Sequence, residues 1–371
     1  MLMDRNTQTP AAQSSVTHHA GITGAPPQST RPRHVIENDA VSSIRWVNQR
    51  IETFFSGDIL ADLLSDAPEP GDTIRWVHLL RACAAEIDQL ATRFSLDGAA
   101  VEDLLAEHER PKYDLGIQSL LIITRGAHFD SDSGDVSTYP ISAIMTPTVL
   151  VTIADDHFPL AAFSARLQKL DRKLSGAALL HQLMDLVVDD YSQIFFDLAD
   201  TIDNLSERTF QDTPLTRDEQ IMTFHLRRTL TAMRRVLGPT MDLASSLALA
   251  SKSKSADDAL ALMLPPDTAR GFADVSEHVA HTSDGINGLR EVMGSLVETN
   301  LSLADFALNT VMKKLAGWAA LIAVPTLITG FMGMNVPYPG FGTTTGFIVA
   351  GFVMVGAVGV LYSAFRRKGW L

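Results

Sequence analysis

Residues 315–334 (LAGWAALIAVPTLITGFMGM) and 343–365 (TTTGFIVAGFVMVGAVGVLYSAF) are the two apolar segments that decide the fold of this 371-residue chain. Neither contains a charged residue, and each is close to the ~20 residues that an α-helix needs to cross a bilayer. Two buried core helices would be equally apolar, but they would not need basic residues at both outer flanks. The sequence therefore predicts two transmembrane helices.

Basic residues lie at the outer ends of both segments. The first segment follows Lys313 and Lys314, and the second precedes a basic tail, residues 366–371 (RRKGWL). The loop between them, residues 335–342 (NVPYPGFG), carries no charge. Because basic residues stay on the cytoplasmic side of a membrane, we expect both chain termini in the cytoplasm and the loop outside. This predicts a multi-pass protein of the cell (inner) membrane.

A helical pattern precedes the first apolar segment and begins near residue 269. It contains no proline before Pro325. At 1.5 Å per residue, about 64 residues of helix span about 95 Å, which is well beyond the thickness of one bilayer. We therefore expect residues 269–334 to form one long stalk helix, whose last part, residues 315–334, is the first transmembrane helix.

The remaining chain divides into three regions. Residues 1–38 are rich in Pro, Ser, Thr and Gln and lack the apolar core of a signal peptide, so we expect a disordered tail. Residues 39–160 form a predicted cytoplasmic α/β domain, and residues 161–268 are helical throughout. The predicted strands are 74–79, 120–124 and 148–153, and the predicted helices of the α/β domain are 84–94 and 98–108. The fold class is therefore an α+β multi-domain membrane protein.

The charge balance excludes some functions. With 43 acidic residues against 30 lysines and arginines, the formal net charge is −13. This argues against nucleic acid as a partner and favours cations. The single cysteine, Cys83, excludes an internal disulfide and a cysteine-based zinc cluster. No nucleophile elbow, paired-histidine metal helix or dinucleotide loop is present, so an enzyme is not expected.

The most periodic helical segment, residues 181–210, is strongly acidic. Its acids recur mainly at spacings of three and four, which places many of them on one side of the helix. This side is either a solvated face or a negative surface that concentrates cations near a pore entrance. The acids are Asp185, Asp189, Asp190, Asp197, Asp200, Asp203 and Glu207.

A stripe of mostly small residues follows the first transmembrane segment at alternating spacings of three and four. Such a stripe allows tight packing between helices, or it lines a narrow pore around a symmetry axis. In a pore, Asn309 and Thr326 would offer polar oxygens, and Met312 and Leu315 would form hydrophobic collars. The stripe consists of Asn309, Met312, Ala316, Ala319, Ala323, Thr326, Gly330 and Gly333.

The end of this segment resembles a known family. Gly333-Met334-Asn335, between a first and a second membrane helix, is similar to the signature of the CorA family of magnesium transporters. Further similar stretches are VEDLLAEHERPKYD (101–114), LRRTLTAMRRVLGP (226–239), ADVSEHV (273–279), NTVMKKL (309–315) and FRRKGWL (365–371). The resemblance implies a homopentamer in which Gly333, Met334 and Asn335 form the selectivity filter.

Such a filter suits the chemistry of Mg²⁺. This ion demands octahedral coordination and gives up water reluctantly, so neutral oxygens that bind its hydration shell are better ligands than carboxylates. A ring of Asn335 carbonyls, backed by main-chain carbonyls at Gly333, has this character. Glycine at 333 would allow a backbone turn and a close approach. The driving force would be the membrane potential, about 4.6 kcal/mol for two charges per 100 mV.

Regulation and ion identity rest on the same resemblance. It implies that Glu102, Asp103 and Asp274 bind a regulatory metal at subunit contacts, so that intracellular Mg²⁺ holds the assembly closed. The loop lacks the Pro-Glu that many relatives carry. A zinc transporter of the ZntB-like branch therefore stays an alternative, and Co²⁺ is a further candidate ion. A more remote alternative is a membrane-anchored scaffold, which would tolerate Asn335→Ala.

Overall fold

The computed structural model describes residues 43–48, 50–54, 59–64, 72–170, 174–209, 214–253 and 259–370. The tail predicted for residues 1–38 lies outside these ranges. The N-terminal part of the described chain contains a seven-stranded sheet in the order β2-β1-β3-β7-β6-β5-β4, in which β3 and β7 pair in parallel and the other pairs are antiparallel. The strands are β1 Ser43–Val47, β2 Arg50–Phe54, β3 Thr73–Leu80, β4 Lys112–Leu115, β5 Leu120–Asp130, β6 Asp135–Met145 and β7 Val149–Ala154.

The longest strands, β5 and β6, form a hairpin that extends beyond the predicted strand at 120–124. Their register runs from Leu120 opposite Met145 to Asp130 opposite Asp135. Asp130 closes the turn by accepting hydrogen bonds from the Ser133 hydroxyl (2.8 Å) and the Asp132 amide (3.0 Å). Gly134 completes the turn with a φ of +71°, a conformation that favours glycine.

Helices cover both faces of the sheet. Side chains alternate along each strand, so Val77, Leu121 and Ile144 pack in one buried cluster, while Trp76, Leu120 and Ile122 pack in the other. The first cluster lies under α1 Ile59–Leu64, α2 Ala84–Phe94 and α3 Gly98–Leu105, and the predicted helix 84–94 is confirmed. The second cluster continues into the helical region, so the predicted α/β and helical regions share one core.

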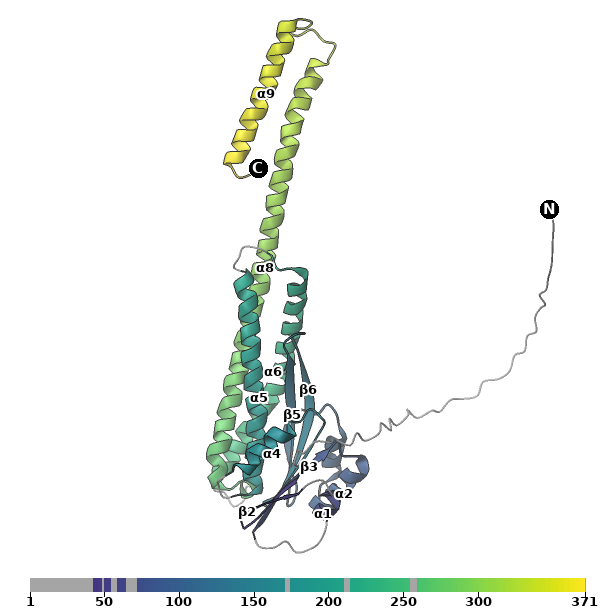
Figure 1. The fold of residues 1–371 in the computed structure, drawn as a ribbon, viewed down its shortest axis with the longest axis vertical. Coiled ribbons are helices and arrows are strands. Elements are labelled where there is room, and N and C mark those ends of the chain that lie inside the picture. The colour runs from purple at the N-terminus through teal and green to yellow at the C-terminus, as the bar shows by residue number, and fades with distance from the viewer. Residues whose placement is uncertain are drawn as a thin grey trace, which may run out of the picture. The chain divides into compact units, whose positions relative to one another are not determined.

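Three long helices form this second layer. They are α5 Gly176–Thr209, α6 Arg217–Lys252 and the N-terminal part of α8 Ala269–Met332. The short α4 Leu160–Gln168 precedes α5, and α7 Ala259–Met263 and η1 Pro266–Thr268 precede α8. Figure 1 shows α5, α6 and α8 side by side along the β5–β6 hairpin.

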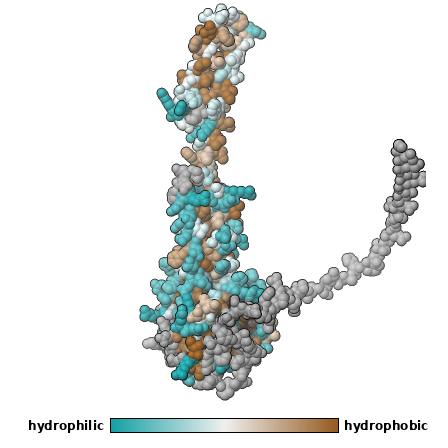
Figure 2. Space-filling view, viewed as in Figure 1, coloured by the Kyte–Doolittle hydropathy of each residue, from teal (hydrophilic) through white to brown (hydrophobic). Residues whose placement is uncertain are grey.

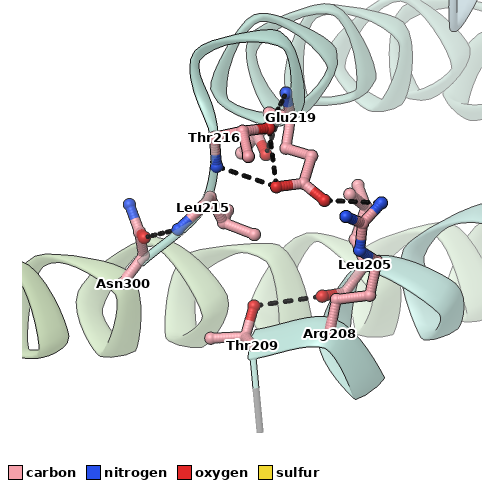
Figure 3. Close-up of polar contacts among 8 residues, drawn as sticks. Leu205, Arg208, Thr209, Leu215, Thr216, Glu219 and Asn300 are labelled. Atoms are coloured by element: carbon pink, nitrogen blue, oxygen red, sulfur yellow. Dashed lines mark hydrogen bonds and ion pairs between the residues drawn. The ribbon is translucent and has the colours of Figure 1, made fainter. Parts of the chain in front are cut away.

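Polar contacts join the start of α6 to the end of α5 and to α8 (Figure 3). Thr216 and Glu219 cap α6 reciprocally, and Glu219 also pairs with Arg208 at the end of α5, with 2.7 Å between nitrogen and oxygen. The Leu215 amide donates to the side-chain oxygen of Asn300 on α8 at 2.8 Å. The tip of the α5–α6 pair is therefore held beside the upper part of the stalk.

The stalk helix α8 runs from Ala269 to Met332 without interruption, and α9 spans Thr344–Arg367. The prediction of one helix from residue 269 through the first apolar segment is confirmed. Between 272 and 296, α8 buries one side in the shared core, whereas no residue from 297 to 316 is buried. Figure 2 shows that the surface becomes predominantly apolar where the end of α8 lies beside α9.

Candidate ion pathway and metal cluster

The apolar parts of α8 and α9 are exposed in the isolated chain. Their most apolar windows have mean hydropathies of 1.8 and 2.2, and only 11% and 0% of these windows are buried. Core helices of a soluble protein would be mostly buried, and a leader sequence would lie near the N-terminus. These surfaces therefore need a nonpolar environment, which a bilayer and neighbouring copies of the chain can provide.

Helix α9 packs against one side of α8. On α8, Gly317 and Leu321 are buried, and Ala320, Val324 and Ile328 are half-buried. These positions follow one another at intervals of three and four residues, so they lie on one side of the helix.

The predicted stripe of small residues lies on the opposite side of α8. Successive residues are about 100° apart around a helix, which places Ala319, Ala323, Thr326 and Gly330 roughly opposite the side that contacts α9. All four are exposed and line an open groove. Within one chain, the stripe therefore does not serve to pack α8 against α9.

Polar and bulky groups lie along the same side. The Thr326 hydroxyl donates to the main-chain oxygen of Ile322 at 2.8 Å, which leaves the hydroxyl lone pairs free to accept from water. Lower on the helix, Asn309 is exposed, and so are Met312 (59%) and Leu315 (70%). The groups predicted to line and close a passage therefore share one exposed side.

Gly333-Met334-Asn335 follows the last turn of α8. The Gly333 amide donates to the Thr329 carbonyl at 2.9 Å, and the Gly333 φ of −81° is a conformation that any residue adopts. The turn itself therefore does not require glycine at 333. A Cβ at 333 would lie 3.3 Å from the Thr329 main-chain oxygen, a tight contact that requires a small shift of the last turn of α8.

Asn335 is exposed, and its side chain makes no hydrogen bond to any residue that the structure describes. The loop beyond it is ordered by other contacts. The Tyr338 hydroxyl donates to the Met332 carbonyl at 3.4 Å, and the Tyr338 ring meets Phe341 edge-on at 5.3 Å between centroids. Gly340 has a φ of +89° and lies against Gly346 at the start of α9. The loop is held in place while the Asn335 amide stays available.

A second group of functional residues lies in the soluble region. Asp185 on α5 and Asp274 and His278 on α8 have their ligand atoms within 4.8 Å of one another. His278 Nε2 lies 3.8 Å from Asp274 Oδ1, one helical turn away. Two carboxylates and an imidazole are a donor set that fits a divalent cation, with the imidazole favouring transition metals.

The charges around this cluster are unevenly compensated. Arg166 on α4 donates to Asp185 at 2.9 Å and to Asp189 at 2.6 Å. Burial is the main cause that raises the pKa of Asp185, and the carboxylates of Asp189 and Asp274 raise it further. Arg166 thus pairs with two carboxylates, and Asp274 adds a third carboxylate that Arg166 does not contact. A bound cation would neutralise its charge.

Most of the chain is similar to one known protein family. Residues 71–367 match the family described as CorA-like Mg²⁺ transporter protein. The chain belongs to this family. The match begins before the third strand and ends at the end of α9, so it includes the sheet, the stalk and both apolar helices.

Individual relatives agree with this assignment. The cobalt/magnesium transport protein CorA of Thermotoga maritima is 25% identical over 305 residues, which are 81% of this chain and 84% of that protein. The divalent cation transporter CmaX of Pseudomonas aeruginosa is 24% identical over 304 residues, 80% of this chain and 87% of that protein. The solved CorA magnesium transporter of Methanocaldococcus jannaschii has the same fold, with a TM-score of 0.70, 22% identity, and coverage of 89% of this chain and 99% of the other.

In this CorA-family chain, the predicted regulatory residues lie in two places. Asp274 belongs to the cluster with Asp185 and His278. Glu102 and Asp103 lie on α3, where Glu102 is exposed and Asp103 accepts a hydrogen bond from Lys112 at 2.8 Å. This contact raises the pKa of Lys112. Asp103 therefore already has a cation partner in the chain, which a metal would have to displace.

Sequence reasoning did not identify Asp185 and His278 as ligands of this CorA-family chain. Asp185 was one of seven acids on α5, and nothing in the pattern distinguished it. The spacing of four residues between Asp274 and His278 is a usable signal, since it places both side chains on one side of a helix. The partner from α5 could come only from the packing of α5 on α8.

Proposed function

We propose that this chain is a divalent cation transporter that conducts Mg²⁺ through a pore formed by several copies of α8 around a common axis. The observation that supports it most is the position of the small-residue stripe, exposed and turned away from α9. The CorA-family assignment and the relatives named as cobalt/magnesium transporters support the same function. The assembly is a homopentamer in a cell membrane, with both termini in the cytoplasm.

The proposed filter recognises a hydrated ion. Asn335 supplies an amide oxygen that has no partner within the described chain, and Gly333 adds a main-chain carbonyl with no side chain beside it. Thr326 and Asn309 extend a path of neutral oxygens, which can accept hydrogen bonds from the water bound to Mg²⁺ without removing it. Met312 and Leu315 close the lower end as collars. The membrane potential drives the cation inward.

Regulation is proposed at the Asp185, Asp274 and His278 cluster. Intracellular metal bound there neutralises acids on α5 and α8, and Glu102 and Asp103 of a neighbouring copy complete the site. Occupied sites hold the copies together in a closed, symmetric state. When metal is lost, repulsion between the carboxylates loosens the assembly and opens the pathway.

The test is ion flux into liposomes that contain the purified protein, at fixed voltage. We expect Mg²⁺ uptake by the wild type and loss of selective uptake on Asn335→Ala. The matched control is Asn204→Ala, which removes an exposed amide from α5. Measuring Co²⁺ and Zn²⁺ alongside identifies the preferred ion, and a strong preference for Zn²⁺ would favour the zinc alternative. Unchanged Mg²⁺ flux in Asn335→Ala would contradict the filter, and absence of flux of any dication in the wild type would contradict the function.

A further inference from the structure

A polar cavity of about 400 Å³ lies between the β5–β6 hairpin, the connection from β7 to α4, and α5. Its volume is within the range of small-ligand sites. None of the residues assigned to the ion pathway or to the metal cluster lines it. The side chains that matter here are Phe129, Tyr139, His157, Asp190, Gln193 and Asp197.

Tyr139 lines one side of this cavity. Its side chain is 95% buried, since the relative exposure is 5%, yet its hydroxyl has no hydrogen-bond partner among the described residues. Its ring lies over Gly126, where a Cβ would come within 2.1 Å of the ring. On another side it stacks with His157 at 5.8 Å between ring centroids. The hydroxyl is accessible from the cavity, where a bound polar group can replace water as its hydrogen-bond partner.

His157 is itself held in position. Its Nδ1 lies 3.2 Å from Asp155 Oδ1, and its main-chain amide donates to the same oxygen at 3.0 Å. With Phe129, the His157 imidazole gives the cavity an apolar wall suited to methylene groups. The cavity therefore joins flat rings on one side to acids on the other.

The acids come from α5. Asp190 and Asp197 are seven residues apart, two helical turns, and therefore lie on the same side of the helix about 10 Å apart. Asp197 accepts a hydrogen bond from Gln193 at 2.9 Å. Asp190 has no hydrogen bond or ion pair to any described residue, because Arg166 is bound to Asp185 and Asp189. Burial, reinforced by Asp189, raises the pKa of Asp190 to about 6.

This arrangement favours an organic cation over a metal ion. Among the described residues, the side chains that bring three metal-ligand atoms within 4.8 Å of one another are Asp185, Asp274 and His278, and none of them lines the cavity. Two carboxylates separated by two turns instead match two positive charges joined by a short chain. An ammonium group carries three donors, which Asp190 and the Tyr139 hydroxyl can accept.

We propose that this cavity binds a short aliphatic diammonium ion. One ammonium group contacts Asp190 and Tyr139, the methylene chain lies along Phe129 and His157, and the second ammonium group contacts Asp197 and the Gln193 carbonyl. Negative charge and neighbouring rings both attract an organic cation. The site is independent of the proposed ion pathway.

The test is isothermal titration calorimetry of the full chain in detergent, with putrescine as the probe. We expect one putrescine bound per chain, and weaker binding of butylamine, which has the same chain length but one charge. Asp190→Asn and Asp197→Asn should each reduce putrescine affinity by about tenfold, as expected for loss of a charge-assisted hydrogen bond. Tyr139→Phe removes only the hydroxyl and should also weaken binding.

The matched control is Asp200→Asn, which removes an exposed acid from the same helix outside the cavity and should leave affinity unchanged. Size-exclusion elution and circular dichroism show whether each variant is folded. Absence of putrescine binding, equal affinity for butylamine, or unchanged affinity in Asp190→Asn would overturn the proposal. The proposal would also be overturned if the chain bound Zn²⁺ but not putrescine, and if Asp190→Asn abolished the Zn²⁺ binding. Putrescine binding is measured without ion flux, so failure of the transport proposal would not be mistaken for failure of this site.

Discussion

Neutralising Asp274 should change stability in opposite directions with and without metal. The Asp185 and Asp274 carboxylates approach within 4.8 Å, and their repulsion is about 0.9 kcal/mol in water or about 3.5 kcal/mol at an effective dielectric constant of 20. The Asp274 side chain is 60% exposed, so the lower value applies. Asp274→Asn should therefore stabilise the metal-free chain by about 1 kcal/mol. It should also weaken metal binding, because one of three ligands is changed.

The assay is thermal unfolding in detergent at about pH 8, with chelator or with Mg²⁺ or Co²⁺. At a metal concentration a hundred times the Kd, the wild type gains about 2.7 kcal/mol, and a tenfold weaker site gains about 1.4 kcal/mol. Asp284→Asn is the control, since it removes an exposed acid from another side of the same helix. Equal metal-dependent stabilisation of Asp274→Asn and wild type would refute the role of the cluster.

Three further substitutions test other parts of the chain. Gly346→Ala places a Cβ 2.2 Å from the Gly340 carbonyl oxygen, so the turn before α9 must shift. We expect the free energy of unfolding to fall by about 1–3 kcal/mol, seen as a lower Tm. The control is Gly351→Ala, where an added Cβ has no neighbour within 4 Å. Gly330→Leu should leave the hairpin folded, because the position has no neighbour within 4 Å, but should reduce Mg²⁺ flux to background in liposomes. Burial raises the pKa of Asp190 from 3.8 to about 6, so its contribution to stability is present below about pH 4 and is lost as pH rises through 6. Asp190→Asn should therefore increase the free energy of unfolding at pH 8 by about 1–2 kcal/mol after allowance for partial solvent access, seen as a higher Tm. It should change Tm little at pH 4, and an equal effect at both pH values would contradict this.

The stalk helix could be predicted from the sequence, whereas the β5–β6 hairpin could not. The bounds of α8 follow from an uninterrupted helical pattern that starts directly after η1. In β6, Pro140 argues against a strand, since proline cannot donate to a ladder. The structure pairs the outer part of β6 with β5, while β7 pairs only from Ile141 onward. Pro140 therefore lies where β6 has one neighbour and its missing donor costs little.

The same distinction applies to the candidate sites. The stripe on α8 could be predicted because all of its residues belong to one helix of known period. Its relation to α9 could not, because that depends on which side of α8 the second helix covers. The metal cluster joins Asp185 to Asp274 across two helices, so it needed the packing of α5 on α8. The cavity at Tyr139 needed the unpredicted hairpin.

The middle of α8 connects these observations to assembly. Between the shared core and the contact with α9, Leu301, Phe306, Leu308 and Val311 are 62–70% exposed, and they precede Lys313 and Lys314 at the start of the predicted membrane segment. Exposing such side chains to water costs about 25 cal/mol per Å² of apolar surface. Association of neighbouring copies along this stretch would remove that cost, and the same interface would continue upward into the small-residue stripe. These exposed apolar residues therefore support the proposed oligomer, since they would destabilise an isolated chain in water.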